Sequence, residues 1–354
     1  MATTEPKPQV GQRRLRKEDP ELITGQGNFV DNITVAGMLW VHVVRSPYAH
    51  ATIKGIDTSK AEKAEGVVAV FTGETLEFAG PLVMAWPIND QVKNPAHHPL
   101  TKDKARYVGD PVAVVVADSR AAAKDAAELV IVDWDPHPAV TSIKDALKDG
   151  APIVHEEFGT NNAGDWVFSR DSPVPPRNPS GPYFEDPDLV TIKEEYYLAR
   201  LIPNAMEPRG VVVDVNQSMG EYTVYSSTQI PHILRTTLTI TVGIPEAKLR
   251  VVAPDVGGGF GSKLEAYPED AICLAIAKKI GRPVKWIEER SEGYVATLHG
   301  REMHQTIELA ATKDGILKAV RVNLAASMGA YLRIITPGIP MLGAWLYAGP
   351  YDCK

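Results

Sequence analysis

Cysteine is almost missing from this 354-residue sequence, which contains only Cys273 and Cys353. Two thiols are too few for a disulfide framework, a four-cysteine zinc site or an iron–sulfur cluster. We therefore expect no metal centre built from the chain's own side chains, and a reducing cytoplasm as its location.

An excess of positive charge is missing as well, and so is any long apolar run. Lysine and arginine number 37 against 44 acidic residues, which gives a net charge of −7. Nucleic-acid-binding proteins are usually basic, so we expect no nucleic acid partner. No apolar segment reaches the roughly 20 residues that a membrane-spanning helix needs. Arg13-Arg14 is followed by charged residues, which argues against an export signal.

The adjacent histidines His97 and His98 lie in a loop rich in proline and asparagine at residues 79–101. Neighbouring residues do not share a helix face, and no carboxylate stands at ligand spacing. The sequence therefore favours a surface loop here over a metal site.

Hydrophobic periodicity predicts alternating strands and helices. In the first part we expect strands at residues 38–44, 52–56, 66–73, 108–117 and 129–134, with helices at 59–64 and from 119 to about 128. After a stretch rich in proline and glycine at 159–187, we expect strands at 190–197, 210–215, 222–226, 249–252 and 284–287, helices at 233–242 and 268–280, and a hairpin of 305–312 with 316–325. This mixture indicates an α+β fold.

Glycine is concentrated in one loop. Four of the five residues after Val256 are glycine, and Phe260 is the exception. Glycine lets a backbone adopt positive φ and approach a ligand closely. Consecutive N–H groups in such a turn form a concavity that suits anions such as phosphate. The alternative interpretation is a flexible turn between a strand and a helix.

The loop does not match the common nucleotide motifs. A P-loop would place Lys before Ser or Thr, but Lys263 follows Ser262 and precedes Leu264. A Rossmann fingerprint would need a third glycine where Ser262 stands, and a kinase loop would need a downstream catalytic set that is missing. We therefore disfavour a nicotinamide dehydrogenase and expect a phosphate-bearing cofactor bound in another way.

The segment PDVGGGFGSK at residues 254–263 resembles the cofactor loop of the molybdenum hydroxylases. This family comprises the large subunits of xanthine dehydrogenase, aldehyde oxidase and carbon monoxide dehydrogenase. Residues 22–31, 44–51 and 108–113 resemble its a/b hammerhead domain, and residues 206–210 and 227–229 resemble the start of its molybdopterin-binding domain. Several matching segments in the right order are more specific than the loop alone.

The resemblance implies an α+β fold in which an a/b hammerhead domain precedes the first part of a molybdopterin-binding domain. We expect a flexible N-terminus at 1–19, the hammerhead at 20–140, a linker at 141–189 and a truncated molybdopterin-binding domain at 190–354. Large subunits of the family are longer, so the chain resembles only their N-terminal half.

By position in the family, Gln229 would donate its amide to the apical oxo group of molybdenum. The alternative for Gln229 is an ordinary polar residue at a strand end. Backbone N–H groups of Gly258, Gly259, Phe260 and Gly261 would line the cofactor. The resemblance implies molybdenum–molybdopterin, in bacteria usually the cytosine dinucleotide form, with no protein ligand to the metal. The implied reaction hydroxylates a small molecule with oxygen from water and passes electrons to iron–sulfur clusters and FAD.

The family's catalytic glutamate and active-site arginine would lie beyond Lys354. Glu207, Glu265 and Glu269 are the nearest substitutes, and we expect each to be structural. Leu264 stands where purine-oxidising members carry a glutamate, which argues against xanthine and leaves aldehydes, aromatic N-heterocycles or carbon monoxide.

We therefore expect a chain that is inactive alone. Its partners would be the missing C-terminal half, an iron–sulfur small subunit and an FAD-binding medium subunit. A non-catalytic cofactor-binding or assembly module is the competing hypothesis.

Overall fold

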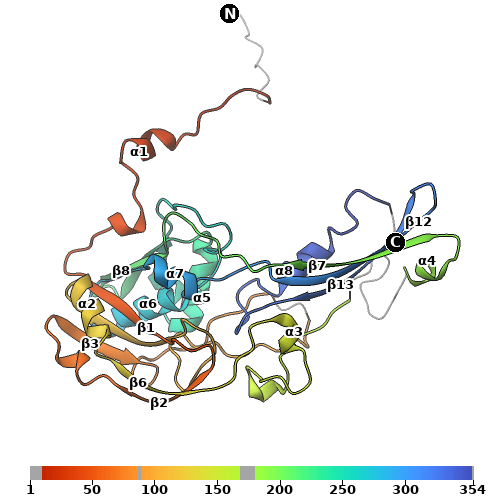
Figure 1. Ribbon diagram of the computed structural model, residues 1–354. Helices are drawn as coiled ribbons and strands as arrows, with labels where there is room; N and C mark the ends of the chain where they lie inside the picture. Colours follow the sequence, from red (N-terminus) through yellow and green to blue (C-terminus); the bar gives the residue numbers. More distant parts are fainter. Residues whose placement is uncertain (1–9, 87–88, 168–179, 353–354) are drawn as a thin grey trace, which may run out of the picture.

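The computed structural model describes residues 10–86, 89–167 and 180–352 (Figure 1). Half of the predicted N-terminal segment, part of the predicted linker and Cys353 lie outside these ranges. No helix in the described part of the chain has the length and apolar content that a membrane crossing needs.

A seven-stranded mixed sheet forms the body of the molecule. Its order is β10-β9-β8-β11-β1-β5-β3. The strands are β10 (Leu249–Val252), β9 (Glu221–Ser226), β8 (Gly210–Asn216), β11 (Val284–Ile287), β1 (Leu39–Arg45), β5 (Pro111–Ala117) and β3 (Val67–Thr72). Two adjacent pairs are parallel, β10 with β9 and β1 with β11, and the other pairs are antiparallel.

The parallel pair β1 and β11 joins the two halves of the sequence, with Leu39 opposite Val284. One continuous sheet therefore contains strands of the predicted hammerhead and of the predicted molybdopterin-binding domain. The boundaries between 140 and 190 stay predictions, but they do not separate two independent sheets.

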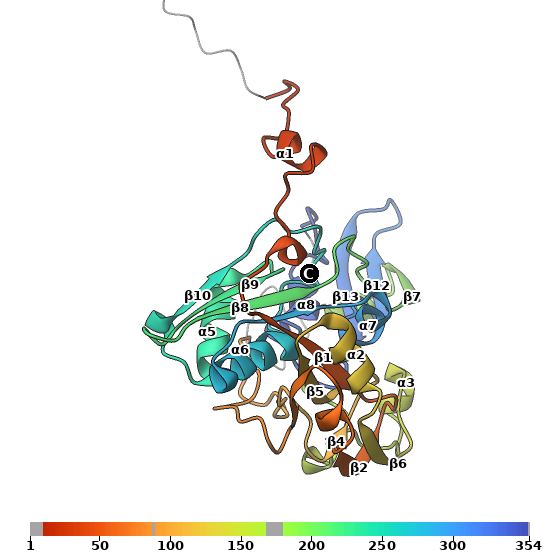
Figure 2. The ribbon, with the colours of Figure 1, turned by 90° about the vertical axis from the view of Figure 1, so that its left-hand side faces the viewer.

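Helices cover both faces of this sheet. On one face α5 (Pro231–Val242) packs on β10, and α6 (Pro268–Ile280) packs on β8 and β11 (Figure 2). On the other face α2 (Arg120–Ala127), capped by the Ser119 side chain, packs on β1 and β5. Side chains alternate along a strand, so Val114 and Val116 join the core that contains α6, whereas Val115 packs with α2. Strand β5 is buried along its whole length.

Two smaller sheets flank the body. One has the order β4-β2-β6, formed by β4 (Lys104–Ala105), β2 (Ala51–Asp57) and β6 (Ile131–Pro136). The other has the order β13-β12-β7, formed by β13 (Leu317–Ala326), β12 (Met303–Ala311) and β7 (Val190–Leu198), and it extends away from the body in Figure 1. The remaining helices are α1 (Asp19–Ile23), α3 (Ile143–Ala146), α4 (Gly181–Glu185), α7 (Arg290–Ala296) and α8 (Gly338–Ala344).

Several local predictions were wrong or incomplete. The helix expected at 59–64 is only a short 3₁₀ turn, Ala61–Lys63, and the helices α1, α3, α4, α7 and α8 and the short strand β4 were not predicted. His97 is not on the surface: it is 2% exposed and stacks on Tyr331 with ring centroids 4.0 Å apart, while His98 is exposed. A long-range aromatic contact buries His97, and local composition carries no signal for such a contact.

Candidate functional site

Gln229 and the glycine loop meet because the chain leaves two adjacent parallel strands on the same side. Strand β9 ends at Ser226 and leads to Gln229, and β10 ends at Val252 and leads to the glycine loop at residues 257–261. The carboxyl ends of parallel strands share one edge of a sheet, which is where open α/β sheets place ligands. Two segments about 30 residues apart thus form one site.

Direct hydrogen bonds join the two segments. The backbone N–H of Gln229 donates to the carbonyl of Lys263 at 2.8 Å, and Gln229 Oε1 accepts from the N–H of Gly261 at 3.1 Å. A Cβ on Gly259 would overlap Gln229 Oε1, so only glycine allows this close approach. With Oε1 bound, Gln229 Nε2 remains as an exposed donor that has no partner among the described residues.

Three successive N–H groups of the loop are unused. Those of Gly258, Gly259 and Phe260 donate to no acceptor in the described part of the chain. The φ values are 96° at Gly258, 53° at Phe260 and 91° at Gly261. Successive N–H groups beside residues of left-handed backbone can form an anion-binding concavity. Phe260 is a non-glycine residue at positive φ and is 75% exposed, and such strain concentrates at functional sites.

Glu207 lies beneath the loop. Its Oε2 accepts three hydrogen bonds, from the N–H of Gly257 at 2.8 Å, from Ser227 Oγ at 2.7 Å and from Lys263 Nζ at 2.8 Å. Burial lowers the pKa of the Lys263 ammonium, and the hydrogen bond to Glu207 opposes that shift. A carboxylate that already accepts three donors is held in place, which favours a structural role for Glu207. No role was predicted for Lys263, although it closes the glycine motif.

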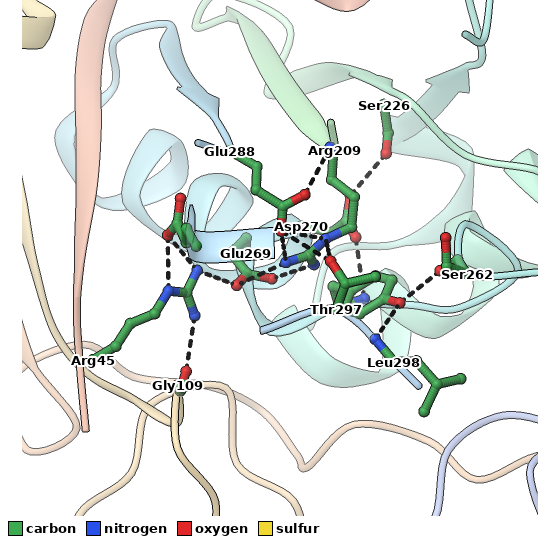
Figure 3. Close-up of polar contacts among 12 residues, drawn as sticks. Arg45, Gly109, Arg209, Ser226, Ser262, Glu269, Asp270, Glu288, Thr297 and Leu298 are labelled. Atoms are coloured by element: carbon green, nitrogen blue, oxygen red, sulfur yellow. Dashed lines mark hydrogen bonds and ion pairs between the residues drawn. The ribbon is translucent and has the colours of Figure 1, made fainter. Parts of the chain in front are cut away.

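Glu269 belongs to a buried ion network (Figure 3). Arg45 on β1 reaches Glu269 at 2.5 Å, and Arg209 reaches Glu269 at 2.8 Å and Glu288 at 2.6 Å. The Arg209 guanidinium also lies 3.8 Å from the ring centroid of Tyr267. Burial by itself would raise the pKa of Glu269, but the two arginines outweigh it and lower the pKa to about 2. Glu269 is therefore a permanent anion of the core.

Glu265 is also withdrawn from the site. It is 2% exposed, and its Oε2 accepts from the N–H of Ile334 at 3.1 Å. Burial raises its pKa to about 7, although Arg333 opposes the shift. All three candidate glutamates are therefore occupied or buried, which is consistent with a catalytic base outside the described residues.

A separate cavity of about 1960 Å³ lies between loops of the first half and the β13 sheet. Tyr107, His155, Tyr331 and Trp345 are among its lining residues, whereas Gln229 and residues 257–261 are not. Size alone does not identify a cofactor site. The N–H groups without acceptors and the Gln229 amide lie outside this cavity. Among the described residues, no group of three or more His, Cys, Asp and Glu side chains is placed to hold a metal ion.

Taken together, the sheet edge, the unbonded N–H groups and the glutamine amide form a candidate site whose donors suit an anionic cofactor. Two family models agree with this class. The aldehyde oxidase and xanthine dehydrogenase a/b hammerhead domain matches residues 24–138, and the molybdopterin cofactor-binding domain matches residues 175–354.

Individual relatives resemble nearly the whole chain. The carbon monoxide dehydrogenase large chain of Hydrogenophaga pseudoflava is 36% identical over 96% of this chain and 42% of its own length. The nicotine 6-hydroxylase large subunit of Paenarthrobacter nicotinovorans is 34% identical over 91% of this chain and 38% of its own length. The crystal structure of quinoline 2-oxidoreductase from Pseudomonas putida 86 superposes with a TM-score of 0.88 at 31% identity, over 98% of this chain and 43% of that one.

The chain belongs to the molybdopterin-binding large-subunit family of the molybdenum hydroxylases. It spans about four tenths of the length of the relatives it matches. The predicted family and the predicted α+β fold with its hammerhead are confirmed.

Proposed function

We propose that this chain is the molybdenum-cofactor-binding part of an enzyme that hydroxylates an aldehyde or an aromatic N-heterocycle with oxygen from water. The observation that carries the proposal is a set of four donors without partners among the described residues, the N–H groups of Gly258, Gly259 and Phe260 and the Nε2 of Gln229, on two segments that hydrogen-bond to each other. Such a set fits a cofactor that presents oxo and phosphate oxygens.

Each residue of the site has a distinct role. Gln229 donates from Nε2 to an oxygen of the cofactor, because its Oε1 is already bound by Gly261. The loop N–H groups donate to anionic oxygens, and Gly259 keeps the loop close to Gln229. Phe260 provides an apolar surface beside these donors. When bound, the molybdenum–molybdopterin group supplies the oxygen-transfer and two-electron chemistry. The cytosine dinucleotide form would carry a second phosphate, which would need further N–H donors.

The substrate class rests on Leu264 and on the relatives. Leu264 is half-buried directly after Lys263, and an apolar side chain there offers no hydrogen bond to a purine. Nicotine and quinoline, which appear in the names of two relatives, are aromatic N-heterocycles. Carbon monoxide is the second candidate substrate, because the relative at 36% identity is a carbon monoxide dehydrogenase large chain.

The chain would act within an assembly. Since Glu207, Glu265 and Glu269 are each hydrogen-bonded or buried, we expect the base to come from the remaining part of the large subunit. Electrons would leave through an iron–sulfur small subunit and an FAD-binding medium subunit. We propose the cytoplasm as the location and no activity for this chain alone.

The test is to purify the chain from its native host with whatever accompanies it. We expect about one molybdenum per chain, cytidine monophosphate after acid hydrolysis, and reduction of a dye with an N-heterocycle or an aldehyde. Gln229→Ala should lower dye reduction about 100-fold or more. Molybdenum binding without dye reduction in the complete assembly would favour the non-catalytic module, and reduction with carbon monoxide the second substrate. Robust dye reduction by the isolated chain would contradict its dependence on the missing half.

A further inference from the structure

We propose that Lys263 and Glu207 are positioning residues that hold the glycine loop against Gln229. This inference rests on the proposed function, since it concerns the same site. It assigns the alignment of the loop to one buried ion pair.

The side chain of Lys263 is 1% exposed, so its charge depends on its partner. Its Nζ donates to Glu207 Oε2 at 2.8 Å and to the Glu207 carbonyl at 2.9 Å. The N–H of Glu207 in turn donates to the carbonyl of Gly257 at 3.1 Å. The side chain and the backbone of Glu207 therefore each bond both to Gly257, at the start of the loop, and to Lys263, just after its end.

The same two residues also bind the segment that carries Gln229. The carbonyl of Lys263 accepts from the N–H of Gln229 at 2.8 Å and from Thr228 Oγ1 at 3.3 Å. Glu207 Oε2 accepts from Ser227 Oγ at 2.7 Å. One ion pair thus contacts residues 227–229 after β9 and residues 257–263 after β10. The hydrogen bond between Gly261 and Gln229 is the outcome of this alignment, because both of its partners lie within or next to the segments that the pair holds.

The test compares a double variant with a matched control in the complete enzyme. Lys263→Met with Glu207→Gln removes both charges together, so no unpaired buried charge remains. Lys285→Met with Asp31→Asn is the control: the Lys285 side chain is 3% exposed and binds the Asp31 carbonyl at 2.7 Å and its carboxylate at 3.1 Å, and neither residue bonds to residues 257–263.

The direct readout is amide hydrogen exchange of Gly261, whose N–H donates to Gln229 Oε1, at a temperature where both variants are folded. We expect the Lys263/Glu207 variant to raise this exchange about tenfold and to lower the molybdenum content about fivefold or more, while the control leaves both at the wild-type value. Unchanged exchange in the Lys263/Glu207 variant would overturn the proposal, and so would an equal increase in the control.

If the double variant does not fold, Glu207→Gln alone serves. It preserves the shape of the side chain, and the Lys263 ammonium can release its proton. We expect the exchange of the Gly261 amide to rise at least threefold, and no rise would overturn the proposal. Absence of molybdenum from the wild-type enzyme would contradict the proposed function, whereas the exchange result still decides the positioning role.

Discussion

Strands β5 and β7 show two extremes within one molecule. All seven residues of β5 are buried, and all nine residues of β7 are exposed. Strand β5 consists of valine and alanine after Pro111 and lies between two layers of helices, whereas β7 mixes charged, aromatic and aliphatic residues with a threonine on the sheet that extends from the body (Figure 1). Stability should therefore reside in the seven-stranded body, and the extended sheet should tolerate change.

The largest effect should come from breaking the ion network of the body. Glu269→Gln leaves Arg45 and Arg209 without their shared carboxylate and should cost about 3–5 kcal/mol of unfolding free energy. On the extended sheet Glu308→Gln breaks a more exposed pair with Arg321 and should cost at most about 1 kcal/mol. Urea unfolding measures both, and equal losses would contradict the comparison.

Apolar truncation should separate the two regions in the same way. Leu274 on α6 is fully buried, so Leu274→Ala should cost about 2–5 kcal/mol through lost burial and a cavity. Ile192 on β7 is 54% exposed, and Ile192→Ala should change the unfolding free energy by no more than about 0.5 kcal/mol. Guanidinium unfolding of both variants tests the difference. A large loss at Ile192 would show that β7 is covered in the protein tested.

A change of pH should also affect the stability of the body and of the extended sheet differently. Burial raises the pKa of Glu265 to about 7 from 4.5, so the folded state binds the proton more tightly. Its contribution to stability is complete below the unfolded pKa and is lost as the pH rises through about 7. At about 1.4 kcal/mol per pKa unit, the loss between pH 4 and pH 8 is roughly 3 kcal/mol.

Glu265→Gln should remove that loss, so its stability relative to wild type should improve with rising pH. Asp110 and Asp270 have pKa values raised to about 6 by burial and affect both proteins alike. Glu308→Gln is the control, because the hydrogen bond from Arg321 lowers the pKa of Glu308 instead. Thermal unfolding from pH 5 to pH 8 measures the difference, and parallel curves for wild type and Glu265→Gln would contradict the shift.

Among the positions of the body, the smallest effect on stability should occur at its edge. Gly259→Ala displaces the flexible Gln229 side chain, which should cost about 1 kcal/mol or less but lower the molybdenum content severalfold. Gly300 has open space around it and no positive φ, so Gly300→Ala should leave both quantities unchanged. The molybdenum content and the melting temperature of both variants test this prediction. Full molybdenum retention by Gly259→Ala would show that the contact with Gln229 is dispensable.

Much of the fold followed from local patterns. The strands at 190–197, 210–215, 249–252 and 284–287 and the helix at 268–280 were predicted within a residue or two, because periodicity and the glycine at 281 report burial and helix ends directly. Helix α7 was missed, since its seven residues include Gly293 and carry little periodic signal. For Gln229 and the glycine loop, the structure brings the predicted residues together, while their roles stay predictions.

By itself the sequence determined the family, the strands, the two long helices and the bare loop that ends in Lys263, because each depends on residues close together along the chain. Only the tertiary structure decided that β9 and β10 run parallel and bring Gln229 to that loop, that β1 joins β11, and that Arg45 and Glu269 share one ion network although 224 residues separate them. Such pairings depend on how distant segments close on a common core, and a linear pattern does not record which strand lies beside which.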